Sequence, residues 1–441
     1  MKESACDLII DARWIIPISP PNDWLEHASI AIHEGLIVKV GPQELIHHEF
    51  RGKKIISLDN HILLPGLVNA HGHAAMTLFR GFSEDMALEN WLSTKIWPLE
   101  TKWVDADFVQ TGSELAIAEM LHSGITCFAD MYFFPEIVAR TAKNIGIRSQ
   151  IAFPIMSSQN RWSKSTDECF HKGLALHDEY RSDDAVNIVL GPHSAYSVSE
   201  KDLQKVLMFS EELSADVHIH LHETNNEITE AHRKQGGSWI EFLNRVGLLS
   251  PRLQAVHAVH LQPDEIQILV ENQVKIIHCP GSNLKLASGI APIRELLSEG
   301  LAIGLGTDSA ASNNSLDILM EARLAALIAK HLHQNADAIS ASQVLEMATL
   351  GGARTLGLDH LIGSLEPGKS ADMIAINVEE AKYQPIYDPI AQLIYTNSSA
   401  SASDSWVRGK HLLKSGKLVT IDKQQVLEKT KDWQRRIAIE R

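Results

Sequence analysis

The sequence has few cysteines, no long apolar run and no cluster of basic residues. Its 441 residues include four cysteines, too widely spaced for CxxC pairs or a compact disulfide framework. No apolar stretch approaches the roughly 20 residues that a membrane helix needs, and residues 1–7 contain no apolar signal core. The formal net charge of −15 disfavours contact with phosphate backbones. These absences predict a cytoplasmic protein that binds neither a membrane nor nucleic acid.

The chain is otherwise globular in composition, apart from its histidines. Hydrophobic residues make up 44% and charged residues 22%, as in ordinary globular domains. There are 22 histidines, and several occur in tight groups. From about Leu67 onward, short apolar runs alternate with amphipathic stretches, which predicts parallel strands joined by helices. The predicted strands are Leu67–His73, Thr126–Asp130, Ser149–Pro154, Val186–His193, Asp216–Glu223, Gln254–His260, Val274–Asn283 and Ala302–Asp308.

Eight strand-then-helix units predict an α/β fold, a closed (β/α)₈ TIM barrel of the metal-dependent hydrolase type. We expect this catalytic barrel to span residues 66–363. Short strands before the barrel need partners to bury their apolar faces, and strands recur after it. We therefore predict a small composite β-sandwich domain built from residues 1–65 and 364–441.

The predicted strands end in residues that can bind a metal. In a barrel these ends converge on one mouth, where active sites lie, and a closed apolar core has no need of polar groups there. The polar residues at these ends are His71, His73, Asp130, His193, His220, Glu223, His257, His260, His278 and Asp308.

Three of these strand ends suggest metal ligands from their local pattern. In the motif His71-Gly-His73, residues i and i+2 of a strand share a face, so both imidazoles can reach one ion. His218, His220 and His222 share one face of an alternating strand, where one of them at the right height can be a ligand, and Asp308 ends the last strand. Each signal is weak alone, since the histidines could be solvated and Asp308 could cap a helix. Together they supply the nitrogen and oxygen ligands of a catalytic zinc with an open position.

The sequence resembles the amidohydrolase superfamily and, within it, the 5-methylthioadenosine/S-adenosylhomocysteine deaminases. The resemblance covers essentially the whole chain. Its motifs are Leu64-Pro-Gly-Leu-Val-Asn-Ala-His71-Gly-His73, Gly191-Pro-His193-Ser-Ala-Tyr196, His220-Leu-His-Glu223-Thr, His257-Ala-Val-His260, His278-Cys-Pro-Gly-Ser-Asn-Leu-Lys-Leu286, Gly306-Thr-Asp308, Ala311-Ser-Asn-Asn-Ser-Leu-Asp317 and Leu365-Glu-Pro-Gly-Lys-Ser-Ala-Asp372.

The resemblance implies zinc-dependent hydrolytic deamination of 5′-methylthioadenosine, S-adenosylhomocysteine or both, with ammonia released. It implies one Zn²⁺ per subunit, with iron or manganese left open as the native metal. Glu223 would shuttle protons, His257 would orient the hydrolytic water, and Asp308 would accept its proton. Glu100 and His193 would bind the ribose, while Glu223 and Asp308 would also contact the substrate. The implied metal ligands are His71, His73, His220 and Asp308.

The sequence departs from the family pattern at three positions. The fourth strand ends in His193 without the lysine that bridges two metals in some relatives, so one metal is expected. The third strand lacks an arginine that some relatives place near the ribose, and Arg161 in the following loop could replace it. Ser309 stands where a glycine usually follows the aspartate.

Two other functions remain open from the sequence. The first is a hydrolase of the same fold acting on another heterocycle, such as guanine, cytosine or a triazine. The ribose contacts implied for Glu100 and His193 argue against it. The second, a non-catalytic barrel scaffold, is disfavoured by the complete set of metal ligands. The expected partner is a small nucleoside substrate, and a homo-oligomer stays open.

Overall fold

The computed structural model describes residues 4–396 and 401–440. The chain divides into two compact units. The first comprises Met1–Asn69, Ala118–Cys127 and Asp317–Ile421, and the second comprises Ala70–Ile117, Phe128–Leu316 and Asp422–Arg441. Each unit thus draws on three separate stretches of the chain. The predicted domain ranges, residues 1–65 with 364–441 and residues 66–363, were drawn from the type of secondary structure and stay a prediction.

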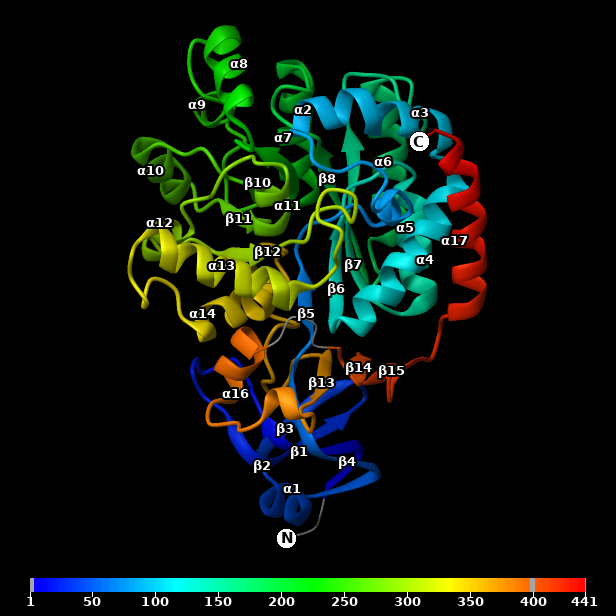
Figure 1. Ribbon diagram of the computed structural model, residues 1–441, viewed down its shortest axis with the longest axis vertical. Coiled ribbons are helices and arrows are strands. Elements are labelled where there is room, and N and C mark those ends of the chain that lie inside the picture. Colours follow the sequence, from blue (N-terminus) through cyan, green and yellow to red (C-terminus); the bar gives the residue numbers. More distant parts are fainter. Residues whose placement is uncertain (1–3, 397–400, 441) are drawn as a thin grey trace. The chain divides into compact units, whose positions relative to one another are not determined.

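The first unit contains an eight-stranded sheet built from both ends of the chain (Figure 1). Its order is β16-β15-β14-β13-β4-β1-β2-β3, and its neighbours are antiparallel except for the parallel pair β1 and β4. The predicted β domain from both termini is therefore confirmed, with its strands joined in one hydrogen-bonded sheet. The strands are β1 (Ser4–Ile15), β2 (Leu25–His33), β3 (Leu36–Pro42), β4 (Phe50–Pro65), β13 (Met373–Asn377), β14 (Asp404–Val407), β15 (Lys410–Lys414) and β16 (Lys417–Leu418).

Both faces of this sheet are packed where β1 crosses it. Successive side chains of a strand point to opposite faces. Leu8 and Ile10 accordingly join the main apolar cluster of the unit, while Ile9 packs on the other face. Ile46, from the short helix α1 (Gln43–Glu49), belongs to that second cluster. Burial on both faces explains why Leu8, Ile9 and Ile10 are apolar in succession.

The second sheet is a barrel of eight parallel strands, in the order β5 to β12. The backbone amide of Ala70 donates to the Leu305 carbonyl at 2.8 Å, and that of Asp308 donates to the His71 carbonyl at 3.1 Å. These bonds join the segment after the first strand of the sheet to the last strand and the segment that follows it. The predicted (β/α)₈ barrel is therefore confirmed. The strands are β5 (Leu67–Asn69), β6 (Ile125–Asp130), β7 (Arg148–Ile155), β8 (Val186–Pro192), β9 (Val217–Leu221), β10 (Leu253–His257), β11 (Lys275–His278) and β12 (Ile303–Leu305).

Helices alternate with these strands, as the sequence predicts. Several predicted strands run past the observed strand ends, the one to Asn283 by the most: β11 ends at His278, and the helix α11 (Pro280–Lys285) follows. Proline has no backbone N–H for a strand ladder but suits the first turn of a helix. The other α-helices between barrel strands are α2 (Leu88–Trp91), α3 (Trp97–Trp103), α4 (Ala106–His122), α5 (Pro135–Ile145), α6 (Thr166–Tyr180), α7 (Glu200–Leu213), α8 (Asn225–Gln235), α9 (Trp239–Val246), α10 (Pro263–Glu271) and α12 (Ile293–Ser298).

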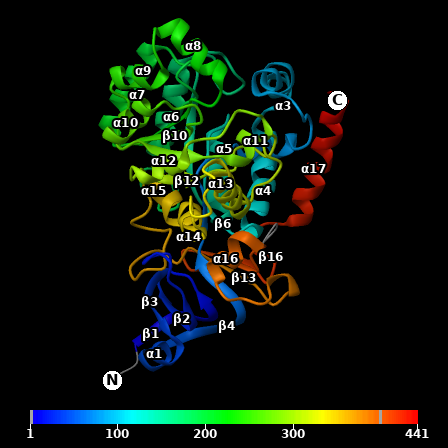
Figure 2. The same cartoon turned by 60° about the vertical axis from the view of Figure 1, so that its left-hand side comes forward.

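The last long helix, α17 (Lys423–Ile437), belongs to the second unit. It lies beside α4 (Figure 2), where the Lys429 ammonium pairs with Glu114 at 3.2 Å. The ring of Trp433 packs edge-on against Phe108, with centroids 5.2 Å apart. The helix thus contacts barrel helices, although the predicted ranges group residues 364–441 with the β domain. No helix in the described part of the chain is long and apolar enough to cross a bilayer.

Candidate metal and active site

The structure brings the four predicted metal ligands together at one end of the barrel. His71 and His73 follow β5, His220 lies in β9, and Asp308 follows β12. His71 Nε2 is 3.2 Å from His220 Nε2. Asp308 Oδ1 is 3.4 Å from His71 Nε2 and 3.3 Å from His73 Nε2. Two overlapping sets of close donor atoms, one with His73 and Asp308 and one with His220 and His257, thus share His71.

Each of these imidazoles is oriented through its other nitrogen. His71 Nδ1 lies 2.8 Å from His218 Nε2. His73 Nδ1 donates to the Met131 carbonyl at 2.5 Å, and His220 Nδ1 donates to the His193 carbonyl at 2.7 Å. Partners of this kind fix the tautomer and the ring orientation of metal-binding histidines. The Nε2 atom of each ring is thereby left to face the neighbouring donor atoms.

Asp308 is held by both its backbone and its side chain. Its φ of 58° is in the left-handed region, where a residue other than glycine costs about 1–3 kcal/mol and often marks a functional site. Asp308 Oδ2 accepts hydrogen bonds from Ser282 at 2.6 Å and from Ser312 at 2.9 Å, which leaves Oδ1 to face the histidines. A side chain at Gly306 would come within 2.9 Å of His71 Cβ, so the strand end must be glycine to approach the ligands.

The electrostatics of the group favour a bound cation. Burial would raise the pKa of the Asp308 carboxyl, but hydrogen bonds from His71 and His73 bring that pKa well below its usual range. Burial likewise opposes the charged form of His73, yet Asp308 raises its pKa to about 9. The His73 imidazolium thus lies beside the ionised Asp308 carboxylate. A metal ion would supply the positive charge in its place.

The spacing of the donor atoms also fits a small divalent ion. Tetrahedral ligand atoms about 2.0–2.1 Å from zinc lie roughly 3.3 Å from one another. Three contacts among these donors match that spacing: His71 to His220 at 3.2 Å, His73 to Asp308 at 3.3 Å and His71 to Asp308 at 3.4 Å. Three imidazoles and one carboxylate are also a donor set typical of zinc. The residues present therefore fit one divalent metal.

Two further predicted residues lie against this group. Glu223 Oε2 is 3.6 Å from His257 Nε2, and His257 belongs to a second set of close donors with His71 and His220. His257 Nδ1 donates to the Asn283 amide oxygen at 2.9 Å. Burial, together with the charge of Asp308, raises the pKa of Glu223 to about 8. Glu223 is thus a buried acid beside the metal group.

The two predicted ribose contacts lie on other elements of the same unit. Glu100 is on α3 (Trp97–Trp103) and accepts a hydrogen bond from the Tyr132 hydroxyl at 2.9 Å. Burial raises the pKa of Glu100 to about 7. The ring of His193 is 4.7 Å from that of His220, and its buried Nδ1 has no hydrogen-bond partner among the described residues. Burial lowers the pKa of His193 to about 4.

Arg161 does not reach into the group. Its side chain is exposed, and its Nε donates to the Val104 carbonyl at 3.0 Å, just after α3. The guanidinium is thus tied to the backbone near Glu100. Ser309 follows Asp308, and its hydroxyl bonds to that of Ser312 at 2.9 Å. Serine is accommodated where relatives have glycine.

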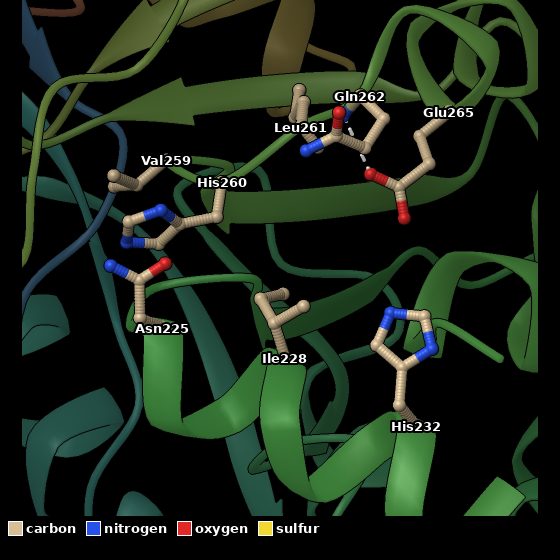
Figure 3. A pocket seen from close by; sticks show the side chains of 8 residues that line it. All are labelled: Asn225, Ile228, His232, Val259, His260, Leu261, Gln262 and Glu265. Atoms are coloured by element: carbon tan, nitrogen blue, oxygen red, sulfur yellow. Dashed lines mark hydrogen bonds between the residues drawn. The ribbon is translucent and has the colours of Figure 1, made fainter. Parts of the chain in front are cut away.

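A separate cavity of about 320 Å³ lies between α8 and the loop after β10 (Figure 3). The His260 imidazole faces the Asn225 amide there, and Glu265 accepts the backbone N–H of Gln262 at 2.7 Å. None of the predicted metal, catalytic or ribose-binding residues lines it. The cavity adjoins the loop that carries Glu223 without contributing to the metal group.

Several supporting residues were not predicted from the sequence. Tyr132 lies between a predicted strand and a predicted helix, and Ser282, Asn283 and Ser312 lie in family motifs without a predicted role. His218 was the exception, since the alternation of Val217–Leu221 places it on the same face as His220. Tyr132, Ser282 and Asn283 contact residues distant in sequence, so local pattern carries no signal for these contacts.

Comparison with known proteins supports the family that the sequence resembles. The Amidohydrolase family model matches residues 62–417. A curated relative, the 5-methylthioadenosine/S-adenosylhomocysteine deaminase of Teredinibacter turnerae, is 43% identical over 435 residues, covering 99% of this chain and 98% of its own.

Two solved structures are similar over nearly their whole length. An adenosine deaminase from Xanthomonas campestris with bound zinc is 38% identical, with a TM-score of 0.97 over 99% of this chain and 100% of that one. An atrazine chlorohydrolase from Arthrobacter aurescens complexed with zinc is 26% identical, with a TM-score of 0.90 over 97% and 100%. The chain therefore belongs to the amidohydrolase family and, within it, to the 5-methylthioadenosine/S-adenosylhomocysteine deaminases.

Proposed function

We propose that this protein, a hydrolase acting on C–N bonds, deaminates 5′-methylthioadenosine, S-adenosylhomocysteine or both. The adenine ring becomes a hypoxanthine ring and ammonia is released. The observation that carries the proposal is the cluster of close metal-binding donor atoms around His71, beside the buried acid Glu223. The names of the relatives, deaminases of nucleosides, support the choice of substrate.

His71, His73, His220 and Asp308 would hold one divalent metal per subunit, zinc in the first instance. Iron and manganese accept the same donors. Such an ion lowers the pKa of bound water towards roughly 7, which makes a nucleophile available at neutral pH. The protein's own part is to keep three Nε2 atoms and one carboxylate oxygen in place through partners on other strands.

Glu223 is suited to deliver a proton to the ring nitrogen beside the attacked carbon. With a pKa of about 8, it is mostly protonated at neutral pH and can act as a general acid. His257 carries its proton on Nδ1, facing Asn283, so Nε2 is free to accept a hydrogen bond from the hydrolytic water. Asp308 and His257 would orient that water and take up its proton, which then passes to the amino group so that it leaves as ammonia.

Glu100 and His193 would bind the ribose. A carboxylate accepts hydrogen bonds from both hydroxyls of a vicinal diol. Glu100 supplies such a carboxylate from a largely buried position. The unpaired Nδ1 of His193 offers a further polar contact beside His220. A free base or a triazine has no hydroxyl for either group, which favours a nucleoside over the alternative heterocycles.

The remaining predictions concern surroundings and partners. The net charge of −15 supports a small-molecule partner and not nucleic acid. The four cysteines are buried and form no disulfide, and the cytoplasmic location stays a prediction. A homo-oligomer likewise stays a prediction.

An ammonia-release screen tests the proposal. Purified protein with measured metal content is assayed with 5′-methylthioadenosine, S-adenosylhomocysteine and adenosine, with guanine and a triazine as controls. We expect release from at least one of the thioether nucleosides, and loss of that release after metal chelation. Equal turnover of guanine or the triazine would refute the nucleoside assignment. Activity that survives complete metal removal would refute the metal assignment.

A further inference from the structure

One turn after β6 contacts both the metal ligands and the ribose carboxylate. Asp130, Met131 and Tyr132 are consecutive and buried. Asp130 Oδ1 accepts the backbone N–H of Ala74 at 2.5 Å, directly after His73. The Met131 carbonyl accepts from His73 Nδ1. The next residue, Tyr132, reaches a different element, α3.

The contact between Tyr132 and Glu100 is well defined. The hydroxyl donates to Glu100 Oε1 at 2.9 Å. Among the residues that the structure describes, it is the one donor found for this carboxylate. Glu100 Oε2 is therefore without a protein partner and can serve a ligand. An ionised carboxylate accepts through both oxygens, so one oxygen is fixed by the protein and the other is left for the sugar.

The tyrosine itself is rigid. It is 5% exposed, and its ring packs against the rings of His73 and Phe133, with centroids 6.2 and 5.2 Å away. A glutamate side chain otherwise turns freely about its last torsion. A hydroxyl fixed by packing removes that freedom and sets the plane of the carboxylate.

We propose that Tyr132 is a positioning residue, which holds Glu100 in the orientation that receives the ribose hydroxyls and so sets a preference for ribonucleosides over nucleosides that lack them. The proposal rests on the proposed function, in which Glu100 binds ribose. Sites built to hydrogen-bond a substrate hydroxyl reject analogues without it, because a buried polar group is then left unpaired. Tyr132 sharpens that rejection by removing the alternative orientations of the carboxylate.

The test compares Tyr132→Phe with the wild type on adenosine and 2′,3′-dideoxyadenosine. We expect kcat/KM on adenosine to fall roughly tenfold, as for the loss of a hydrogen bond to a charged group, mainly through a higher KM. On the dideoxynucleoside kcat/KM should fall less than about twofold, since this substrate has no ribose hydroxyl to donate a hydrogen bond to Glu100. In a Glu100→Ala background, Tyr132→Phe should cost nothing further, because the residue acts through Glu100.

Matched controls separate positioning from folding. Tyr180→Phe removes a buried tyrosine hydroxyl at the end of α6, before β8 and thus at the other end of the barrel, and should leave the ribose preference unchanged. Metal content and thermal unfolding are measured for every variant. Tyr132→Phe should keep a full metal complement, because the bond to His73 comes from the Met131 backbone.

Three outcomes would overturn the proposal. They are an equal loss on both nucleosides, no loss on either, and a full additional loss in the Glu100→Ala background. A wild type that binds metal yet releases no ammonia from any adenosine-type nucleoside would instead refute the proposed function. Calorimetric titration of both proteins with adenosine and the dideoxynucleoside then decides the role of Tyr132, because equal wild-type affinities for the two would refute it.

Discussion

A chain of hydrogen bonds runs from the candidate metal ligand His71 into the barrel. His71 Nδ1 meets His218 Nε2 at 2.8 Å, and His218 Nδ1 meets the Gln254 amide oxygen at 2.8 Å. The Gln254 amide nitrogen donates to Asp216 at 2.9 Å, and Lys275 pairs with the same carboxylate oxygen at 3.1 Å. The amide oxygen requires the proton of His218 on Nδ1, so Nε2 accepts from His71. This chain therefore keeps the lone pair of His71 Nε2 directed at the metal position.

His218→Phe tests this role directly. Phenylalanine preserves an aromatic ring in a fully packed position but removes the acceptor for His71. Loss of such a partner typically lowers metal affinity about 10- to 100-fold, or about 1.4–2.7 kcal/mol. We expect a shift of this size when zinc is titrated against a competing chelator. Thermal unfolding with excess metal shows whether the variant still folds.

The control is His232→Phe, which alters an exposed histidine on α8 outside the metal group and should leave zinc affinity unchanged. His218→Gln keeps an amide oxygen as an acceptor and should recover part of the affinity. If a folded His218→Phe protein binds zinc within about twofold of the wild type, against the 10-fold minimum expected, the hydrogen-bond chain does not orient His71.

Other predictions concern the reacting groups. Asp308→Asn should abolish turnover even where some metal remains, while the wild type binds about one ion per chain by elemental analysis; a ratio near two would contradict the single site. Glu223→Gln should lower kcat about 10²- to 10⁴-fold at unchanged metal content, and a near-normal kcat would remove its acid role. Glu100→Ala should lower kcat/KM about 10- to 150-fold on ribonucleosides but far less on 2′,3′-dideoxynucleosides.

The barrel could be predicted because its sequence pattern is local. Each strand is a short apolar run, and the rule that active sites lie at the carboxyl ends of barrel strands turns eight separate runs into one location. That rule places His71, His73, His220 and Asp308 among the polar residues at strand ends, and the family resemblance then selects these four as ligands. Glu100 follows only from the family resemblance. The stretch around it forms a π-helical turn, Leu92–Ile96, and the short helix α3, which have no simple apolar period.

The supporting contacts could not be predicted because they depend on register between strands. Gln254 lies directly beside His218 across β9 and β10, and a shift of one residue would turn its side chain to the other face. Asn283 reaches His257 because Pro280 ends the extended run and begins α11. The helix α17 was missed for another reason. Its buried residues Val426 and Trp433 have helical spacing, but chain position alone assigned them to the β domain.

The metal group depends on barrel closure, because each ligand is held by a different strand-and-helix unit. His71 is oriented from β9, His73 from the turn after β6, and His220 from the end of β8. Asp308 is held from α11 and from the loop after β12. A ligand in an open chain would keep its chemistry but lose its orienting partner, so the arrangement exists only in the closed barrel. Metal affinity and the stability of the barrel are therefore thermodynamically linked, since an ion that binds only the closed form stabilises it.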